Sequence, residues 1–569
     1  MFLWLGLVLA LWLNYEAWQR DYAQPAPVTQ SVTTAPKTAD NSALATEIPG
    51  TAAPTPASST PAAANNATTV VAATPEIPGE TALAATPEPA RIVRVITDVL
   101  TLEVSEQGGA VVGAQLNGYP LVKGERKPVE LFNRAANTFY YLQTGLAGAP
   151  GAAAPTHLAR YQAAAGEYRL ADGTAELRVP LTWTDAASGV TVTKTFVLRR
   201  GQYRIEVEYA VDNRGTTPWT ASSYAQILRD DKPVERSMFS VESYAFKGPA
   251  YYNGTKYFKI DRAKVADAEL PREVTDGWIA GMQHHFVTAV VPEKGRAYRY
   301  SLKTEGDQYL LAVAGPAVAV APQGSAKLSE TLYVGPKLQA QLKTTGPRLD
   351  LVADYGRLTL LAEPLFWLLE QAHKMVGNWG WAIILITALL KLVFYPLSES
   401  SGKSMAKMRV LGPRIKNLQE TYKDDREKLG RAMMDLYKRE KVNPLAGCLP
   451  ILIQMPVFFA FYWVLLESVE MRQAPFMFWI QDLSSKDPFF VLPVMMVGAM
   501  FVQYKLNPTP PDPIQAKVFM IMPIFMSATF AFFPAGLVLY WVTNTLLSIA
   551  QQWNINRRIE ADAKKAHSS

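Results

Sequence analysis

The chain has 569 residues, of which 49% are hydrophobic and 19% are charged, and its formal net charge is +6. Its single cysteine, Cys448, excludes an intrachain disulfide and a cysteine-rich zinc site. Apolar runs crowd the last third, whereas charged and polar residues fill the rest. This asymmetry excludes one uniform soluble body and predicts a membrane-spanning region behind a polar one.

Residues 1–20 open with the apolar run Phe2–Leu13, which has no basic segment before it and no convincing small-residue cleavage site after it. We expect an uncleaved transmembrane anchor; a signal peptide is the alternative. Residues 21–90 are rich in Pro, Ala and Thr, and 24–90 contain no aromatic residue. Such a segment cannot bury enough apolar surface to fold, so it is interpreted as a disordered linker.

Residues 91–345 show the alternation of half-buried antiparallel strands. From Gln202 to Val211 every second side chain is apolar, and Asp212–Gly215 is a good turn. We therefore predict a large all-β domain, a sandwich or a barrel. His284 and His285 fall in a strand-like stretch, where neighbours point to opposite faces, so no shared metal is expected.

Residues 350–376 form a bridge whose leucines fall near helical spacing, with Pro364 starting or kinking the helix. An amphipathic helix in the membrane interface fits this pattern. The alternative is a short helix packed on the β domain.

The region 377–555 contains four apolar runs, which we read as five membrane spans. The runs are Trp379–Tyr395, Leu449–Leu466, Phe489–Val502 and Val518–Ile549. The last is long enough for two short spans, and Phe533-Pro534-Ala535-Gly536 marks a turn between them.

Between the first two runs lies a polar insert, 397–445, with twelve Lys/Arg against seven Asp/Glu. Its helical periodicity predicts a hairpin over 398–444, with breaks at Gly412-Pro413 and Tyr422–Asp425. Met405 and Met408 on one arm and Met433 and Tyr437 on the other form its apolar faces. These faces either adapt to varied partners or form a plain hairpin seam.

The basic residues set the topology. The insert and the basic tail 556–569 should be cytoplasmic, which places the β domain on the other side of a bacterial inner membrane, in the periplasm.

Lys391 is the only charge in its span, and a central charge costs about 2.5–3.5 kcal/mol on insertion scales. Thr387 lies one turn earlier on the same face. Gln454 lies in the second core span, and Tyr540, Thr543, Asn544 and Ser548 follow a helical spacing in the last. The set predicts a wet pocket that opens towards the cytoplasm. The alternative is that Lys391 snorkels and the others bond between helices.

Catalytic motifs are weak. Gly402-Lys403-Ser404 resembles the end of a phosphate-binding loop, but the loop's first glycine is replaced by Leu397. No carboxylate dyad and no Ser/His/Asp arrangement is recognisable. We expect no enzyme, no catalytic residue, no metal and no cofactor.

Several motifs resemble the YidC/Oxa/Alb membrane insertase family, over Asp354 to about Arg558. They are Lys391–Leu397, Ser404–Arg409, Tyr437–Leu445, Pro450–Pro456, Arg472–Pro475 and Phe533–Tyr540. The anchor and outer domain resemble the Gram-negative version in layout. The resemblance implies a polytopic α-helical membrane protein, with five core helices around a hydrophilic groove and a periplasmic β-supersandwich.

The resemblance also assigns roles within this groove. Its cation is usually Arg, and Lys391 takes that position here. Thr387, Gln454, Tyr540 and Trp541 are implied groove or substrate contacts, with Asn544 beside them.

The implied function is insertion and chaperoning of inner-membrane proteins, alone or with a Sec-type translocon. Ribosomes or targeting factors would meet the hairpin, including Arg409, and the tail. Nascent membrane proteins and lipids are the other expected partners, and sequence-specific nucleic acid is not. Alternatives are a small-molecule transporter with a carbohydrate-binding outer domain and an anchored enzyme of mutarotase type. Deleting most of 91–340 should spare insertion but abolish such an enzyme.

Overall fold

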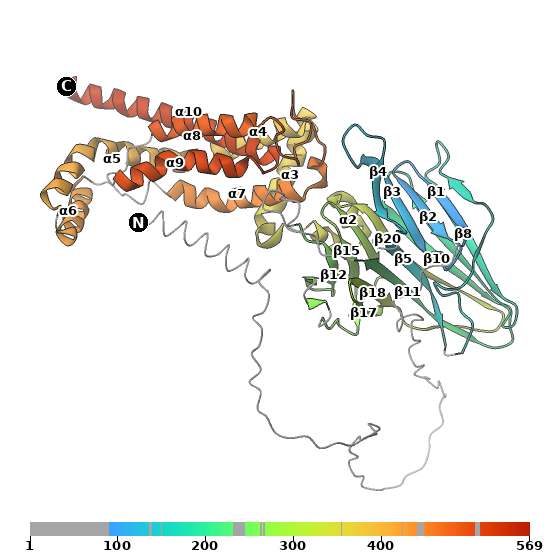
Figure 1. Ribbon diagram of the computed structural model, residues 1–569. Coiled ribbons are helices and arrows are strands. Elements are labelled where there is room, and N and C mark those ends of the chain that lie inside the picture. The colour runs from blue at the N-terminus through green and yellow to red at the C-terminus, as the bar shows by residue number, and fades with distance from the viewer. Residues whose placement is uncertain are drawn as a thin grey trace, which may run out of the picture. The chain divides into compact units, whose positions relative to one another are not determined.

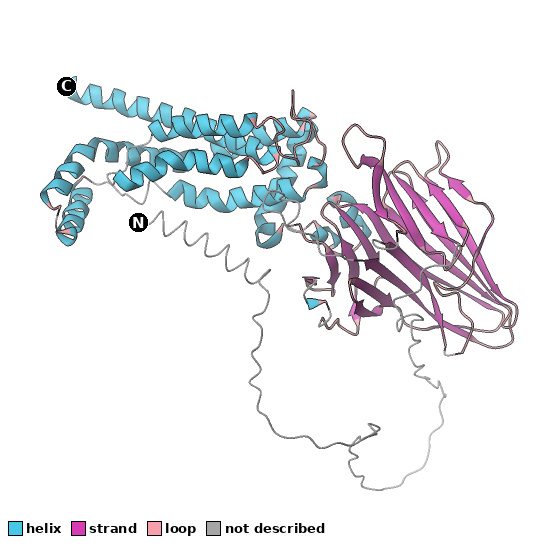
Figure 2. Ribbon diagram, in the orientation of Figure 1, coloured by secondary structure: helices cyan, strands magenta, loops and turns pink. Residues whose placement is uncertain are grey.

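The computed structural model describes residues 90–135, 139–149, 151–230, 245–261, 264–265, 268–353, 355–423, 425–440, 449–506 and 513–568. All of them belong to one compact unit, Thr74–Ser569. The expected anchor, 1–20, and all but the last residue of the expected linker, 21–90, lie outside the described residues. Strands, magenta in Figure 2, come first in the order of elements along the described chain, and most of the helices, cyan in Figure 2, come after them.

The strands form two sheets. The first has eleven strands, in the order β14 (Val274–Thr275), β17 (Ala297–Glu305), β18 (Gln308–Ala314), β11 (Trp219–Asp230), β5 (Tyr140–Gly148), β3 (Val111–Pro120), β2 (Leu100–Ser105), β1 (Ile92–Ile96) and β7 (Glu167–Arg169), with β19 (Val318–Val320) on β11 and β4 (Pro128–Phe132) on β3. The second has nine strands, in the order β13 (Tyr257–Lys259), β12 (Gly248–Tyr252), β15 (Trp278–Met282), β16 (Phe286–Val291), β20 (Gly324–Pro336), β10 (Arg204–Asn213), β9 (Val190–Arg199), β8 (Glu176–Asp185) and β6 (Gln162–Ala163).

One hydrophobic core joins side chains of both sheets, including Leu102 of β2 and Phe196 of β9. The predicted alternation in β10 is confirmed, because Ile205, Val207 and Tyr209 are fully buried. In the register, Val207 lies between Phe196 of β9 and Glu330 of β20. The all-β prediction therefore resolves into two sheets with a shared interior (Figure 1).

A fully buried lysine donates hydrogen bonds to three backbone carbonyls in the interior of this domain. Lys194 has no exposed surface, and its Nζ donates to the carbonyls of Gly108, Gly109 and Thr144 at 2.8, 3.0 and 2.9 Å. Burial lowers the pKa of Lys194 to about 7. An added Cβ at Gly109 would lie 2.9 Å from this Nζ, so the glycine leaves room for the ammonium.

The strand prediction for His284 and His285 is wrong. Both residues lie in the turn between β15 and β16, and their rings stack with centroids 3.8 Å apart. A turn releases neighbouring side chains from the alternation of a strand, which is why the two rings share one side.

The helices begin at the end of the β domain. They are α2 (Gln339–Thr345), α3 (Thr359–Val376), α4 (Trp379–Val393), α5 (Tyr395–Thr421), α6 (Arg426–Arg439), α7 (Leu449–Glu467), α8 (Val491–Leu506), α9 (Pro513–Phe530) and α10 (Ala535–Ser568), with short 3-10 turns η3 (Leu349–Val352), η4 (Gly356–Leu358) and η6 (Val469–Met471). Helix α10 packs on α4 and α8, and α8 packs on α9 (Figure 1).

One local prediction about the helices is wrong, and another is confirmed. The break expected at Gly412-Pro413 is wrong, because α5 continues through Pro413 and ends at Thr421. A proline within a helix removes one hydrogen bond, and the rest of a long helix tolerates that loss. The turn at Phe533–Gly536 is confirmed at the start of α10, but α10 runs on through the predicted tail, 556–569, as far as Ser568.

Judged by length and composition, none of the helices within the described ranges can cross a bilayer singly. Helix α4 and the first ten residues of α5, Tyr395–Ser404, meet the criterion together across a bend of 62°.

Helix α3 packs on α4 and α7 through Ala362, Phe366 and Leu369. It therefore belongs to the helical core rather than to the β domain. Its other face leaves Leu360 and Met375 exposed by 86% and 79%. Exposed apolar side chains together with the Glu370–Lys374 ion pair make this helix compatible with a membrane interface.

Candidate functional site

Lys391 lies in the last turn of α4 and faces α10. Its Nζ donates to Ser548 Oγ at 2.7 Å, and Ser548 Oγ in turn donates to the carbonyl of Asn544 at 2.7 Å. The side chain of Lys391 is half-buried. The structure therefore pairs Lys391 with a hydroxyl of another helix, in a direct interhelical hydrogen bond.

A stripe of polar residues continues along α10 on the same face. Asn544, Ser548, Gln552 and Asn556 follow at intervals of four residues, and Gln552 Nε2 donates to Asn556 Oδ1 at 2.9 Å. Sequence reasoning stopped at Ser548 and missed Gln552 and Asn556. The four-residue spacing of polar side chains continues in the sequence to Asn556, although the apolar run ends at Ile549.

Thr387 is buried on the same helix as Lys391. Its Oγ1 donates to the carbonyl of Ile383 at 2.6 Å, which satisfies the hydroxyl within α4. Thr387 and Lys391 lie one turn apart on α4, as predicted. The Thr387 hydroxyl bonds within α4, however, whereas the Lys391 ammonium bonds to α10.

Tyr540 and Trp541 form an aromatic contact between three helices. The Tyr540 ring lies 4.8 Å from that of Phe461, and Trp541 lies 4.7 Å from Phe458 and 5.2 Å from Phe530. These rings join α10 to α7 and α9. Gln454 lies one turn before Phe458 on α7 and is half-buried.

The hairpin α5–α6 closes on a small apolar seam. Leu411 and Ile415 are buried, and Met408, Met433 and Tyr437 pack against them. Met408, Met433 and Tyr437 therefore form a plain hairpin seam, which is one of the two alternatives for the apolar faces. Met405 and Arg409 lie in α5, but their side chains fall outside the described residues.

Gly402 explains the weak resemblance to a phosphate-binding loop. It lies inside α5, and an added Cβ would lie 2.9 Å from Ile555 Cδ1 of α10. The glycine therefore permits close packing of two helices.

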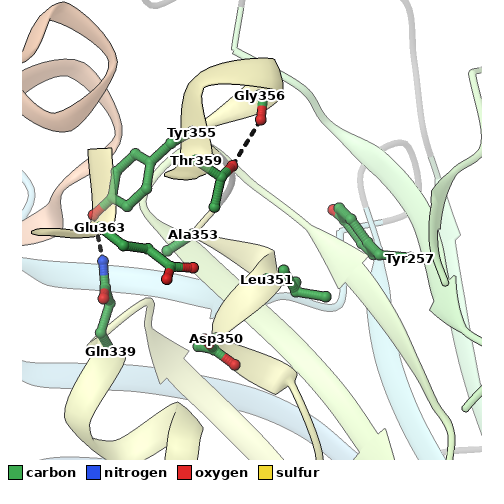
Figure 3. Close-up of a pocket in the computed structure, with 9 residues that line it drawn as sticks. All are labelled: Tyr257, Gln339, Asp350, Leu351, Ala353, Tyr355, Gly356, Thr359 and Glu363. Atoms are coloured by element: carbon green, nitrogen blue, oxygen red, sulfur yellow. Dashed lines mark hydrogen bonds between the residues drawn. The ribbon is translucent and has the colours of Figure 1, made fainter. Parts of the chain in front are cut away.

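A cavity of about 160 Å³ lies where the β domain meets α3 (Figure 3). Tyr355 accepts a hydrogen bond from Gln339, and Thr359 Oγ1 donates to the carbonyl of Gly356 at 2.7 Å. Asp350 and Glu363 supply its carboxylates. Neither this cavity nor a larger one described below is lined by Lys391.

Two family models match nearly all of the described chain. The model described as "YidC periplasmic domain" matches residues 92–368, and the one described as "60Kd inner membrane protein" matches residues 371–563. A protein of Thioalkalivibrio sulfidiphilus named "Membrane protein insertase YidC" is 45% identical over 574 residues, covering 99% of both chains. One of the same name from Pseudomonas fluorescens is 44% identical over 575 residues, covering 99% of this chain and 98% of its own.

Among solved structures, one described as an active YidC insertase covers 81% of this chain and 94% of its own, at 18% identity and a TM-score of 0.36. A galactose mutarotase related enzyme from Lactobacillus acidophilus covers 43% of this chain and 97% of its own, at 7% identity and a TM-score of 0.29. Scores this low carry no structural argument.

A large periplasmic β domain joined to an apolar helical core defines an inner-membrane transport protein rather than an enzyme. Full-length identity of 45% then settles the family. The chain belongs to the YidC family of membrane protein insertases, in the Gram-negative form that carries a periplasmic domain.

Proposed function

We propose that this chain inserts and chaperones integral proteins of the inner membrane through a hydrophilic groove between α4, α7 and α10. Lys391, Thr387, Gln454, Tyr540, Trp541 and Asn544 are the proposed groove residues. Nascent membrane proteins are its substrates, and their hydrophobic segments leave between α7 and α10 into lipid.

The bond from Lys391 to Ser548 is the observation that carries this proposal. Holding a cation inside an apolar bundle is costly, and a fold keeps one where polar partners or water receive it. The polar stripe of α10 continues from Ser548 to Asn556, which supports a groove that reaches the cytoplasmic end of the helix.

The mechanism is physical and forms no covalent bond. Polar segments of a substrate have to cross a layer of low dielectric constant, and a wet groove shortens that crossing. Lys391 attracts acidic residues of the moving segment, because Coulomb attraction strengthens where water is scarce. Trp541, which is half-buried beside the buried Tyr540, offers apolar segments a surface for sliding contact.

The partners belong to the same proposal. The cytoplasmic hairpin, 398–444, and the basic end of α10 would receive ribosomes or targeting factors, and the core would work alone or beside a Sec-type translocon. The domain limits also remain proposals: a periplasmic β domain over 91–345, an interfacial helix within 350–376 and an insertase core over 377–555.

Site-specific crosslinking tests the groove. A photoreactive side chain at Gln454 or Tyr540 should crosslink to a stalled nascent membrane protein. The same group at Ile524 or Phe525 of α9, exposed by 61% and 69%, should capture lipid instead. If Gln454 and Tyr540 give no nascent-chain adducts above the α9 positions, the groove proposal is wrong.

A further inference from the structure

We propose that a cavity beneath the β domain, at the periplasmic ends of α7 and α8, binds the headgroup of an anionic phospholipid from the outer leaflet. Its volume is about 760 Å³, within the range of small-ligand sites. The proposal does not depend on the substrate groove, because none of the groove residues lines this cavity.

Two of the segments that line the cavity, the β3–β4 loop and the loop after α7, are hydrogen-bonded to each other. The loop after α7 contributes Arg472, whose Nη2 donates to the carbonyl of Pro120 at 2.9 Å, and Gln473, whose Nε2 donates to the same carbonyl at 2.9 Å. In return, Lys123 of the β3–β4 loop donates from Nζ to the carbonyl of Gln473 at 3.0 Å and to that of Gln481. These reciprocal hydrogen bonds hold the two loops against each other and so fix part of the cavity wall.

The charge of the lining favours an anion. The described lining residues include four cationic side chains, those of Lys123, Arg229, Lys247 and Arg472, and one carboxylate, that of Asp482. The carbonyl partners of Lys123 are neutral, so they position the ammonium without cancelling its charge.

Asp482 is engaged by its own loop. Its Oδ1 accepts from the backbone N–H groups of Gln473 and Ser484, both at 2.9 Å, and its Oδ2 accepts from Ser485 Oγ at 2.9 Å. A carboxylate that already accepts these bonds shapes the loop, and it opposes an incoming anion less than a free one would.

Apolar side chains beside the cavity distinguish a lipid from a soluble anion. Leu121 and Val122, which line the cavity, are each 51% exposed. On the α7–α8 loop, Phe478 and Phe489 are 75% and 69% exposed. Exposed aromatic rings favour the level of the headgroups, and basic pockets beside membrane helices bind anionic headgroups. A lipid contacts both the cationic lining and the exposed apolar side chains, whereas free phosphate contacts only the cationic side chains.

The test uses the full-length protein, freed of lipid in a neutral detergent. Dioctanoyl phosphatidylglycerol, dioctanoyl phosphatidylcholine, inorganic phosphate and an acidic peptide are the probes, and native mass spectrometry counts the bound lipid. We expect phosphatidylglycerol to bind at least tenfold more tightly than phosphatidylcholine, and we expect neither millimolar phosphate nor the peptide to displace it.

The variant K123Q/K247Q should weaken phosphatidylglycerol binding by about 10- to 30-fold, since each basic residue near a lipid surface contributes roughly a fivefold change in affinity. The matched control K327Q/K343Q removes the same charge from two exposed lysines that do not line the cavity. It should bind within about twofold of the parent.

Because Lys123 also fastens the two loops, Val122→Asp provides a second route, and it places a negative charge at an exposed position. It should weaken phosphatidylglycerol binding while leaving the circular dichroism spectrum and the melting temperature unchanged. Equal binding by the cavity and control variants would overturn the proposal. So would equal binding of the two lipids, displacement by phosphate, which marks a free-anion site, or displacement by the peptide, which marks a polypeptide site.

Discussion

Lys391 Nζ lies 2.7 Å from Ser548 Oγ, and this one bond joins the only charged residue of α4 to the polar stripe of α10. A lysine that only snorkelled would extend to the membrane surface along its own helix. Lys391 instead bonds across to a neighbouring helix, where the next polar residues, Gln552 and Asn556, lie closer to the cytoplasm.

The groove model predicts that the charge at position 391 matters more than the shape of the side chain. Lys391→Arg should retain insertion, because the guanidinium keeps the charge and reaches the same hydroxyl. Lys391→Ala should impair substrates with acidic translocated segments about tenfold, and neutral substrates by less. Complementation of a depletion strain, combined with protease protection of each substrate class, measures both effects. Equal losses for acidic and neutral substrates would contradict the electrostatic role.

Lys194 should be central to the stability of the β domain. Lys194→Met leaves the carbonyls of Gly108, Gly109 and Thr144 without their donor, and each unsatisfied buried acceptor costs about 1–3 kcal/mol. We expect urea midpoints, followed by tyrosine and tryptophan fluorescence, to fall clearly. The control Lys327→Met, at an exposed position on β20, should change the stability by no more than about 0.5 kcal/mol. Coincident midpoints would show that Lys194 is dispensable.

The stacked histidines predict acid sensitivity where the β domain meets the helical core. His284 Nε2 donates to the carbonyl of Leu466 at 3.1 Å, and burial lowers the pKa of His284 to about 3 and that of His285 to about 2. Between these values and the ordinary pKa of about 6.5, the folded state binds fewer protons than the unfolded state. Their contribution to stability is therefore complete above pH 6.5 and is lost as the pH falls.

Melting curves at pH 7.5, 6.5 and 5.5 measure this contribution. The parent should lose melting temperature on acidification, and the H284Q/H285Q variant should lose less. A variant with the same pH slope as the parent would assign the acid sensitivity to other groups.

Adjacent methionines on α6 separate a seam from a partner surface. Met433 packs against the seam, whereas Met434 is 55% exposed. Met433→Ala should loosen the hairpin, since truncating a part-buried methionine costs about 1–2 kcal/mol, and trypsin should then cut faster around Lys423 and Lys428. Met434→Ala should leave cleavage unchanged and weaken binding to ribosome-nascent-chain complexes. The opposite pattern would place the partner surface on the seam residues.

Patterns along the chain determined much of this protein. The period of two predicted the buried face of β10, and the apolar runs predicted the helices of the core, because burial is encoded in periodicity. The isolated charge of Lys391 also stood out by itself, since a charge within an apolar run is costly wherever the helix lies.

Contacts between distant segments were decided only by the tertiary structure. The partner of Lys391 is 157 residues away, and the three carbonyls around Lys194 are 50 to 86 residues away. Likewise, only the packing of α5 on α10 explains Gly402. The local pattern of residues indicates whether a side chain is buried or exposed to water. Which groups meet depends on how the helices and sheets pack on one another, and no single segment contains that information.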